Sequence, residues 1–374
     1  MQLTPDQAAA ADAIYRWQRS SSRVFALRGL AGTGKTSLVS ELLGGFPAAV
    51  VAPTGRAASV LQRKGIAAST IHAAIYRLVA SPHGERWVLR STYGDEPQPL
   101  VIVDEASMVN RETLDDLLAC FQRVLLVGDH GQLPPIEGEA PLAKVEGVTL
   151  TTIMRQALDS GIIRAAHKLR QGAPIDEAIR VGGDDVRGRL PVEGEIDATW
   201  PLGLATCITA KNADRVWVNT RIREQVVGDQ PGLVPGDRLV ALSNSPDGWC
   251  NGTVADVIES HADAPLYDDE GDEHAFIPFR ALCDDDAERE GSALVSQLDF
   301  ATRRDDVCRS FYRSLRGIRR RLFQRGWCLT AHKAQGSEWP KVVVYGDGFG
   351  SSEERAAWRY TAATRAREAL FWVR

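Results

Sequence analysis

The segment from Gly29 to Thr36 has the residue types and spacing of a phosphate-binding loop. It reads Gly-Leu-Ala-Gly-Thr-Gly-Lys-Thr and fits the pattern G-x-x-x-x-G-K-S/T at every position. An apolar run precedes the segment and a helical pattern follows it, as such a loop requires. Its glycines let backbone N–H groups turn toward phosphate oxygens, and the N-terminus of the following helix adds a favourable dipole. We therefore expect Lys35 to reach the β- and γ-phosphates of ATP and the Thr36 hydroxyl to bind Mg²⁺. The predicted nucleotide contacts are Gly29, Leu30, Ala31, Gly32, Thr33, Gly34, Lys35, Thr36 and Ser37.

Two carboxylates, Asp104 and Glu105, directly follow the apolar run Val101-Ile102-Val103. A strand there would deliver both side chains at its carboxyl end. Asp104 is then expected to hold Mg²⁺, and Glu105 to polarise an attacking water. A hydrophobic run followed by Asp-Glu is common by itself, but downstream of a phosphate-binding loop it indicates a nucleotide hydrolase. These residues do not say what work the hydrolysis drives.

Short apolar runs that alternate with helical patterns are expected to position these residues. In the first part of the chain we predict strands at 24–27, 48–52, 100–103 and 124–127, and helices at 35–43 and 56–63. This alternation indicates a parallel, doubly wound sheet, so residues 1–148 are predicted to form one α/β domain. A second α/β pattern has strands at 205–209, 327–329, 342–345 and 370–373, and a helix at 213–225.

Residues 81–99 interrupt the first α/β pattern. They carry Gly, Pro and charge around Trp87-Val88-Leu89, and Gly94-Asp95 is a candidate turn. We predict a small hairpin that leaves the first domain at this point.

Residues 223–325 interrupt the second α/β domain, which is predicted to comprise 149–222 and 326–374. β-like runs at 238–242 and 253–258 indicate an inserted β domain. The acidic stretch 263–290 is interpreted as a solvated loop, and residues 303–325, which contain nine Arg, as a helix.

The composition limits the class of protein but not its partners. The net charge is −5, so any binding of a polyanion must depend on cations gathered along one groove. Only seven of the 44 cationic side chains are Lys; this Arg bias suits phosphate contacts, and a GC-rich genome would produce it equally. No apolar stretch is long enough to span a membrane and no signal sequence is evident, which favours a soluble cytoplasmic protein of a bacterial or phage-infected cell. Six cysteines with no C-x-x-C spacing are interpreted as free thiols: Cys120, Cys207, Cys250, Cys283, Cys308 and Cys328.

Seven further segments follow one another in an ordered series along the chain. They are Leu3-Thr4-Pro5-Asp6-Gln7, Ala52-Pro53-Thr54-Gly55-Arg56-Ala57-Ala58, Ser69-Thr70-Ile71-His72, Gly128-Asp129-His130-Gly131-Gln132-Leu133-Pro134-Pro135, Met154-Arg155-Gln156, Thr330-Ala331-His332-Lys333-Ala334-Gln335-Gly336-Ser337-Glu338 and Tyr360-Thr361-Ala362-Ala363-Thr364-Arg365-Ala366-Arg367. In this order they resemble the Q motif and motifs Ia, Ib, III, IV, V and VI of superfamily 1 DNA helicases of the B branch, the RecD-like and Dda-like enzymes. The resemblance covers nearly the whole chain.

The resemblance implies roles at the nucleotide. Gln7 would read the adenine edge, although Thr4-Pro5-Asp6 also suits a helix N-terminus, and both interpretations can hold. Gln132 would sense the γ-phosphate and link it to the nucleic acid. Arg155 and Arg365 would reach the γ-phosphate from the second domain and stabilise the charge that develops there, whereas either arginine alone could be a surface ion pair. Motif V implies further nucleotide contacts at Gly336 and Glu338.

The resemblance also implies a path for single-stranded DNA. The predicted DNA contacts are Pro53, Thr54, Arg56, His72, His130, Thr330, His332 and Lys333. The alternatives are that Thr54 and His72 are capping or surface residues and that His130 only fills a turn. The hairpin at 81–99 would act as a pin at the fork, with Trp87 or Tyr93 stacked on the last base pair. Packing of Trp87 onto the domain core is the competing interpretation.

The expected fold is therefore α/β, with two RecA-like P-loop NTPase domains. A small hairpin would be inserted in the first domain and an SH3-like β-barrel in the second. The expected function is a 5′→3′ DNA helicase that couples Mg-ATP hydrolysis to translocation on single strands and to duplex unwinding. Its expected partners are single-stranded DNA and single-strand/duplex junctions, with single-strand-binding, replication or recombination proteins as further candidates, and it would act as a monomer away from membranes. The alternatives are a translocase that displaces proteins without unwinding and a nucleotide-switched, DNA-binding scaffold ATPase, which single-stranded DNA would not stimulate.

Overall fold

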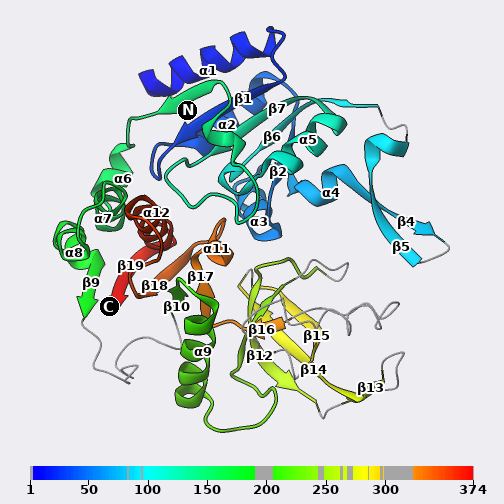
Figure 1. Cartoon of the computed structure of the whole chain (residues 1–374), viewed down its shortest axis with the longest axis vertical. Helices are drawn as coiled ribbons and strands as arrows, with labels where there is room; N and C mark the ends of the chain where they lie inside the picture. The colour runs from blue at the N-terminus through cyan, green and yellow to red at the C-terminus, as the bar shows by residue number, and fades with distance from the viewer. Residues whose placement is uncertain are drawn as a thin grey trace. The chain divides into compact units, whose positions relative to one another are not determined.

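The computed structural model describes residues 3–81, 84–93, 96–189, 205–242, 248–261, 264–267, 273–284, 286–294, 298 and 323–373 (Figure 1). The chain divides into two compact units. The first comprises Met1–Arg187, Gln335–Ser337 and Phe349–Arg365, and the second comprises Gly188–Ala334, Glu338–Gly348 and Ala366–Arg374. The sequence placed the boundary near residue 149 instead. The first unit extends further because the segment after 149 is tied to the phosphate-binding loop, where the Met154 N–H donates to the Gly32 carbonyl over 2.8 Å.

The first unit is built on a six-stranded sheet with the order β3-β2-β6-β7-β1-β8, and the neighbouring strands run parallel. The strands are β1 (Val24–Gly29), β2 (Ala49–Ala52), β3 (Ala68–Thr70), β6 (Gln98–Val103), β7 (Phe121–Gly128) and β8 (Gly147–Leu150). The four strands predicted from apolar runs are present. The two outer strands, β3 and β8, were not predicted because they are short and carry no continuous apolar run.

Helices cover both faces of this sheet. The helices α1 (Pro5–Gln18), α2 (Lys35–Gly45) and α3 (Gly55–Arg63) pack on one face, and α4 (Ile71–Ile75) and α5 (Arg111–Cys120) on the other. Successive strand residues alternate between the two cores: Phe25 and Leu27 join the core of the first face, and Ala26 that of the second. Burial on both faces explains why these strands are almost wholly apolar.

Parallel strands end at a common edge of the sheet, and the candidate site residues follow those ends. The phosphate-binding loop follows β1, Pro53 follows β2, Asp104 follows β6 and Asp129 follows β7. The fold therefore gathers four separate segments at one edge, as open α/β sheets generally do.

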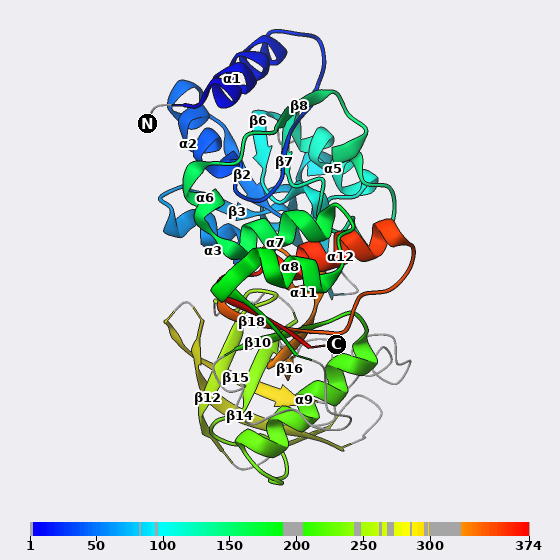
Figure 2. The ribbon, with the colours of Figure 1, turned by 90° about the vertical axis from the view of Figure 1, so that its left-hand side faces the viewer.

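A group of helices completes the first unit: α6 (Arg155–Asp159), α7 (Gly161–Arg170), α8 (Ile175–Gly182) and α12 (Ser352–Ala363). Helix α7 packs against both α8 and α12 (Figure 2). Short 3-10 turns lie at η1 (Arg90–Tyr93), η2 (Ala106–Met108), η3 (Pro141–Ala143) and η4 (Gly183–Asp185).

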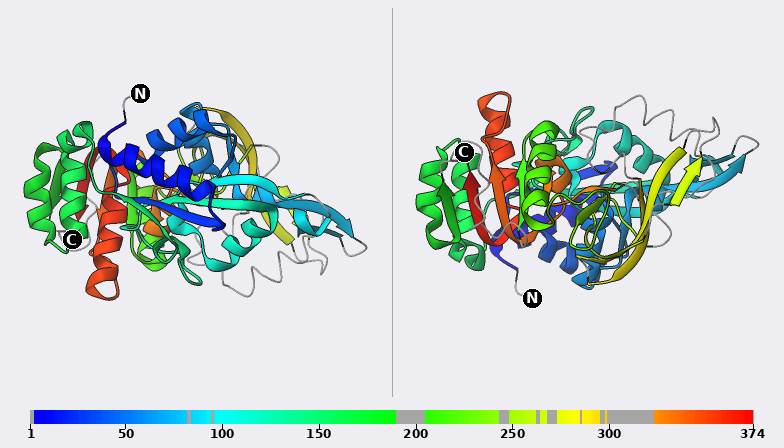
Figure 3. Two further views of the ribbon diagram at one scale, coloured as in Figure 1. Left: turned by 90° about the horizontal axis from the view of Figure 1, so that it is seen from above. Right: turned by 90° about the horizontal axis from the view of Figure 1, so that it is seen from below.

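A two-stranded antiparallel hairpin extends from the first unit (Figures 1 and 3). It consists of β4 (Tyr76–Ser81) and β5 (Gly84–Leu89), with Tyr76 opposite Leu89 and Ser81 opposite Gly84. The expected arm Trp87-Val88-Leu89 lies in β5. The two strands of the hairpin are joined between Ser81 and Gly84, whereas the candidate turn Gly94-Asp95 lies outside the described residues. The side chains of Trp87 and Tyr93 lie outside the described residues.

The second unit contains a five-stranded sheet with the order β17-β10-β18-β19-β9. Its strands are β9 (Val186–Arg189), β10 (Thr206–Thr209), β17 (Cys328–Thr330), β18 (Trp339–Tyr345) and β19 (Ala366–Val373). β10 runs parallel to β17 and β18, and β18 runs parallel to β19. Val218 and Ile222 of α9 (Asn212–Val226) pack on this sheet, and α11 (Ala331–Ala334) follows β17.

An antiparallel sheet makes up the rest of the second unit, and it overturns one interpretation of the sequence. Its described strands are β11 (Arg238–Ala241), β12 (Val254–Ser260), β13 (Ala264–Tyr267), β14 (Glu273–Cys283), β15 (Glu288–Leu294) and β16 (Phe323–Arg325). The stretch 263–290 is therefore not a solvated loop. Alternate residues of β14, such as Ile277 and Phe279, enter the core, and this period of two is hidden by the acidic composition around it. Residues 323–325 of the expected arginine-rich helix are a strand, and the remainder of that segment lies outside the described residues.

No helix in the described ranges is long and apolar enough to cross a membrane. The five cysteines that the structure describes, Cys120, Cys207, Cys250, Cys283 and Cys328, are not in disulfides.

A fully buried carboxylate joins α9 to the antiparallel sheet. Asp237, which is 0% exposed, accepts hydrogen bonds from Arg223 Nε (2.8 Å) and the Val234 N–H (2.9 Å) and pairs with Arg325 Nη1 (2.8 Å). One buried guanidinium group, that of Arg325, and one partly buried group, that of Arg223, thus share one acid. Such a cluster is costly to break because the remaining charges stay buried.

We predict that Asp237→Ala lowers the free energy of unfolding by about 3–5 kcal/mol, since it removes the carboxylate that pairs with the buried Arg325 and the partly buried Arg223. Urea unfolding measures the change, and hydrogen exchange of peptides covering 238–260 assigns it to this sheet. Asp256→Ala is the matched control: it removes the half-exposed partner of Arg238 in the same sheet and should cost less than about 1 kcal/mol. Equal effects of the two changes would contradict the structural role of the Asp237 cluster.

Candidate functional site

The phosphate-binding loop has a backbone that only glycine accommodates at two positions. Gly32 and Gly34 have φ values of +82° and +79°. A Cβ on Gly34 would lie 2.4 Å from Gln7 Nε2, and one on Gly32 would lie 2.6 Å from the Cβ of Ala157. Both the left-handed backbone and the close neighbours therefore exclude side chains at these positions.

Lys35 begins α2 and folds back across the loop. Its ammonium group donates to the carbonyls of Gly29 (2.7 Å) and Leu30 (3.0 Å). The ammonium group, the Thr36 hydroxyl at the start of α2 and the loop N–H groups form a donor set that fits a nucleotide polyphosphate with Mg²⁺. Among the described residues no group of three or more His, Cys, Asp or Glu forms a metal site. A magnesium site that uses one or two protein ligands together with substrate phosphates agrees with this finding.

Gln7 lies against the loop and is 1% exposed. Its Oε1 accepts from the Thr4 N–H (3.1 Å) and Thr4 Oγ1 accepts from the Gln7 N–H (3.2 Å), which forms a capping box at the start of α1. Its Nε2 donates to the Gly34 carbonyl over 3.3 Å. The helix-cap interpretation of this motif is confirmed, and the Gln7 amide also supports the phosphate-binding loop directly.

Asp104 and Glu105 lie where β6 ends, as expected. Burial raises the pKa of Asp104. Burial also raises the pKa of Glu105 to about 7, against the opposing positive charge of Arg365 and with a further contribution from Asp104. Glu105 has a φ of +51°, a left-handed conformation that is uncommon for residues with a side chain. Strained backbone of this kind concentrates at functional sites, where the surrounding structure enforces it.

The segment after β7 brings Gln132 to the same edge of the sheet. Gln132 is 8% exposed, and its buried Oε1 has no hydrogen-bond partner among the described residues. An unpaired buried amide oxygen is costly, so this atom is available for a donor that the protein does not supply. His130 is exposed, and partial desolvation lowers its pKa against the opposing effect of Asp129.

The two predicted arginine fingers group with the phosphate-binding loop in the first unit. Arg365 is 3% exposed, and its guanidinium donates to the carbonyls of Thr361 (3.1 Å) and Ser337 (3.0 Å). Its charge acts on the Glu105 carboxylate. Arg155 begins α6 beside Gly32, and its side chain lies outside the described residues.

The predicted DNA contacts of the first unit differ in exposure. Pro53 and Thr54 are half-buried, Arg56 is buried and His72 is exposed. Thr54 caps α3, its Oγ1 accepting from the Ala57 N–H over 3.1 Å. The capping interpretation of Thr54 is thus confirmed, and its predicted DNA contact stays a prediction.

Gly336 of motif V packs onto motif Ia rather than onto the phosphate-binding loop. Its φ is +70°, and a Cβ there would lie 3.0 Å from the Cβ of Ala57 and 3.3 Å from Thr54 Oγ1. Gly336 therefore makes a packing contact between two motifs, and its predicted nucleotide contact stays a prediction.

The remaining predicted residues belong to the second unit. Thr330 is buried, and its Oγ1 accepts from the Lys333 N–H over 3.4 Å. Lys333 Nζ donates to Gln324 Oε1 over 3.1 Å. Burial lowers the pKa of His332, and Glu338 is exposed.

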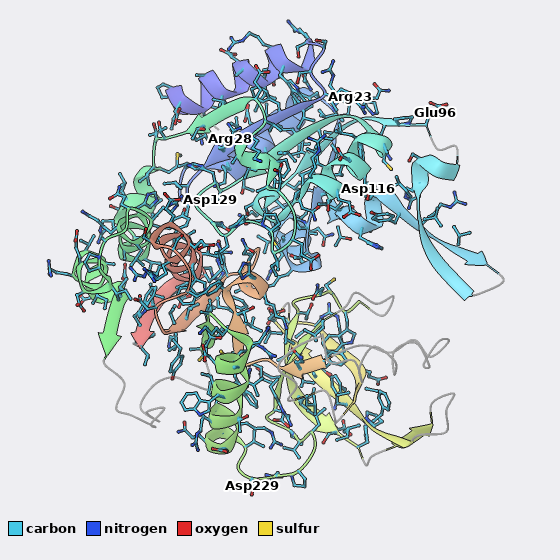
Figure 4. All side chains as sticks on the ribbon, viewed as in Figure 1. Arg23, Arg28, Glu96, Asp116, Asp129 and Asp229 are labelled. Carbon is cyan, nitrogen blue, oxygen red and sulfur yellow. The ribbon has the colours of Figure 1, made fainter. Side chains whose placement is uncertain are left out.

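Three polar side chains that the sequence left without a role join the motifs to one another. Thr361 Oγ1 accepts from the Leu133 N–H (2.9 Å), and Gln335 Nε2 donates to the Leu133 carbonyl (2.8 Å). The Tyr360 hydroxyl bonds Asp129, which is labelled in Figure 4. Each belongs to a quoted motif, so motif membership was the available signal. Their partners lie far away in sequence and could not be named from it.

Comparisons with known proteins identify the family. A family model described as an AAA domain matches residues 2–188, and one described as a UvrD-like helicase C-terminal domain matches residues 325–373. The ATP-dependent RecD2 DNA helicase of Deinococcus radiodurans is 30% identical over 399 residues, which cover 99% of this chain and 48% of that protein. The chain belongs to the RecD-like helicases of the B branch of superfamily 1. The RecBCD enzyme subunit RecD of Mycobacterium tuberculosis is 32% identical over 201 residues. That match covers 46% of this chain and 34% of the RecD subunit.

Solved structures of Pif1 helicases share the fold of this superfamily 1 chain. A Bacteroides Pif1 helicase in complex with ADP-AlF3 and single-stranded DNA has a TM-score of 0.58 at 19% identity, over 100% of this chain and 92% of that one. A Pif1 structure described for DNA unwinding at forked duplexes has a TM-score of 0.60 at 18% identity, with the same coverage. The two parallel sheets are thus those of RecA-like domains. The chain spans about half the length of the RecD2 helicase and a smaller share of the length of the RecD subunits that it matches.

We predict that Glu105→Gly is more stable than Glu105→Ala by about 1 kcal/mol, because only glycine adopts a φ of +51° without steric cost. Both variants lose the carboxylate, so their difference in the free energy of unfolding isolates the backbone. At the neighbouring Asp104, whose φ is not positive, the order should reverse. Thermal and urea unfolding of the four variants measure both differences. A glycine variant at 105 that is no more stable than the alanine variant would contradict the strain at this residue.

Proposed function

We propose that this chain is an ATP-dependent DNA helicase that moves 5′→3′ along single-stranded DNA. The observation that carries the proposal is the gathering, in one compact unit, of Lys35, Glu105, Gln132 and Arg365 around the ends of parallel strands. The name of the RecD2 relative and the fold of the Pif1 helicases support the choice of DNA as the substrate.

The arrangement supports a division of labour in ATP hydrolysis. Lys35 and the loop N–H groups would bind the β- and γ-phosphates, and Thr36 and Asp104 would hold Mg²⁺. Bound Mg²⁺ supplies positive charge to the phosphate oxygens and so stabilises the charge that develops on them. Glu105 would accept a proton from the attacking water, a task for which a carboxylate needs a raised pKa and a nearby cation that keeps it ionised.

Two further groups would complete this site. Gln132 would orient the attacking water, and its buried Oε1, which has no partner among the described residues, supports this role. Arg365, with Arg155 as the second candidate, would stabilise the charge that develops on the γ-phosphoryl group.

Contacts between motifs support coupling of hydrolysis to DNA. Leu133 follows Gln132 and is held on both sides by Thr361 and Gln335, so a shift at Gln132 would reach motifs V and VI. Gly336 continues this path, because it packs against Thr54, a predicted DNA contact at the end of β2. These contacts form a continuous path from Gln132, at the predicted nucleotide site, to Thr54, a predicted DNA contact.

We predict that the chain, with ATP and Mg²⁺, unwinds a duplex with a 5′ single-stranded tail and not one with a 3′ tail. Single-stranded DNA should stimulate its ATPase. Lys35→Ala is the control: it should abolish hydrolysis and unwinding while single-stranded DNA binding persists, since the Lys35 ammonium group bonds carbonyls of the phosphate-binding loop.

Other outcomes would each favour a different function. ATPase that single-stranded DNA does not stimulate would indicate the scaffold alternative. Stimulated ATPase without unwinding of either substrate would indicate a translocase. Unwinding of the 3′-tailed duplex would overturn the proposed direction.

We also propose that the hairpin of β4 and β5 is the pin that separates the strands. Its base is firmly attached to the first unit. The hydroxyl of Tyr76 donates to the carboxylate of Asp116 on α5, which is labelled in Figure 4. Tyr76 and Leu89 also pack against the core on the face of the sheet that α4 and α5 cover. A hairpin that extends from an ATPase domain can act as a wedge if its base is fixed, because the base then resists a force applied at the tip.

We predict that removal of the outer hairpin lowers duplex unwinding more than tenfold and spares DNA-stimulated ATPase. Replacing residues 78–87 by Asn-Gly joins Arg77 to Val88, which already face each other across the strand pair, through a turn that suits antiparallel strands. Strand displacement and ATPase are measured side by side. Tyr76→Phe is the control for the base, since it removes the Asp116 contact without shortening the arm. Normal unwinding by the shortened protein would show that another surface parts the strands.

A further inference from the structure

Both backbone polar groups of one residue in the phosphate-binding loop, Ala31, are held by side chains from outside the loop. The Ala31 N–H donates to the Tyr360 hydroxyl over 2.6 Å. The Ala31 carbonyl accepts from His167 Nε2 over 3.1 Å, so this ring nitrogen carries the proton. Ala31 lies in the middle of the loop, directly before Gly32. Both hydrogen bonds join it to residues outside the loop, so neither is one of the bonds within the loop.

The two side chains come from helices that pack together. Tyr360 lies on α12 and His167 on α7, and their rings meet edge to face with centroids 6.1 Å apart. On α7, Ile163 lies one turn before His167, and its Cγ2 would be 3.6 Å from a Cβ on Gly32. One face of α7 therefore follows the loop from Gly32 to Ala31. This helix lies outside all the sequence motifs.

The Tyr360 hydroxyl also binds a second segment of the site. It donates to Asp129 Oδ2 over 2.6 Å, and Asp129 Oδ1 accepts from the Gly131 N–H over 2.8 Å. Tyr360 and Asp129 are 0% and 1% exposed, so water cannot replace either contact. A phenol has one proton to donate, so its single donor goes to Asp129 while a lone pair accepts from Ala31. The hydroxyl thus joins the phosphate-binding loop to the segment that carries Gln132.

We propose that Tyr360 and His167 are positioning residues that clamp the backbone on both sides of Ala31 and thereby aim the N–H groups of the phosphate-binding loop at the nucleotide. The loop contains two glycines in left-handed conformation, so its backbone has few internal restraints. Fixing the two peptide groups that flank the Ala31 Cα removes the rotations that would turn the neighbouring N–H groups away. The proposal rests on the proposed nucleotide site and adds the residues that hold its loop in shape.

The same contacts make the clamp cooperative. Without the hydroxyl, the Ala31 N–H and the Asp129 carboxylate lose a partner together, because one atom serves both. Loss of Tyr360 and loss of Asp129 should therefore weaken nucleotide binding by the same route. Two residues that act through one bond show non-additive effects, whereas independent structural damage adds.

The test is binding of MgADP by calorimetry to the full chain and to Tyr360→Phe, Asp129→Asn and the double variant. Each single change should raise the dissociation constant about tenfold, the size expected when a buried hydrogen bond is lost, and the double variant should be no weaker than the weaker single variant. His167→Gln keeps an N–H donor and should bind better than His167→Leu. Tyr345→Phe, which removes a hydroxyl from β18 in the second unit, is the matched control and should bind as the unchanged chain does.

Several results would overturn the clamp. Additive effects, or a Tyr360→Phe variant within twofold of the unchanged chain, would show that the hydroxyl does not position the loop. Tighter MgADP binding by that variant would show that the tyrosine competes with phosphate for the Ala31 N–H. Thermal unfolding of each ligand-free variant separates loss of fold from loss of position, because His167→Gln and His167→Leu should then differ in binding but not in melting temperature.

Failure of the clamp and failure of the proposed helicase function are distinguishable. The clamp is measured by nucleotide binding without DNA, and the helicase function by strand displacement. A chain that binds MgADP with the expected variant pattern but does not unwind DNA would retain the clamp and lose the helicase proposal. A chain that binds no MgADP would lose both.

Discussion

Between β1 and α2 the chain must curl so tightly that its N–H groups face one point, and this constraint organises the first unit. The curl requires left-handed backbone at Gly32 and Gly34, which ordinary residues avoid and glycine adopts at little cost. A loop without side chains cannot pack itself, so other segments support it from several sides. Gln7 of α1, Met154 before α6, His167 of α7 and Tyr360 of α12 each bond its backbone.

Electrostatics at the end of β6 depends on that support. Glu105 is held in a strained conformation and in surroundings that raise its pKa to about 7, largely through burial. The nearby Arg365 guanidinium opposes this shift and keeps the carboxylate closer to ionisation. Arg365 is itself fixed by carbonyls of motifs V and VI. The pKa of Glu105 therefore depends on an arginine more than two hundred residues away in the sequence, and that arginine is held by motifs V and VI.

Outside the first unit, composition was a poor guide wherever it masked a period. The strand β14 lies within an acidic stretch, yet Ile277, Phe279 and Ala281 alternate into a core with Trp249 and Phe323. Net charge reports on solvation and says little about which face of a strand is buried.

The hairpin of the first unit shows a related weakness of turn signals in the sequence. Gly94-Asp95 has the residues of a turn, but the strands pair in a register that reverses the chain before Gly84.

The sequence by itself determined the chemistry of the contiguous motifs. A phosphate-binding loop, a strand that ends in two carboxylates and a run of alternating strands and helices are local patterns, because each depends on neighbours within a few residues. They were enough to predict the parallel sheets and to place Lys35, Asp104 and Glu105 at one edge of a sheet, whereas the family and the role of Gln132 came from the resemblance of the seven further motifs.

Only the tertiary structure decided which residues meet across the chain. The bonds from Tyr360 to Ala31 and Asp129, the packing of Gly336 on Thr54 and the role of α7 join residues that no short pattern relates. Hydrogen bonds of this kind depend on angles and distances set by the packing of whole helices. A tyrosine or histidine looks the same in sequence whether it faces solvent or holds a loop, and so its partner is known only once the fold has brought the two together.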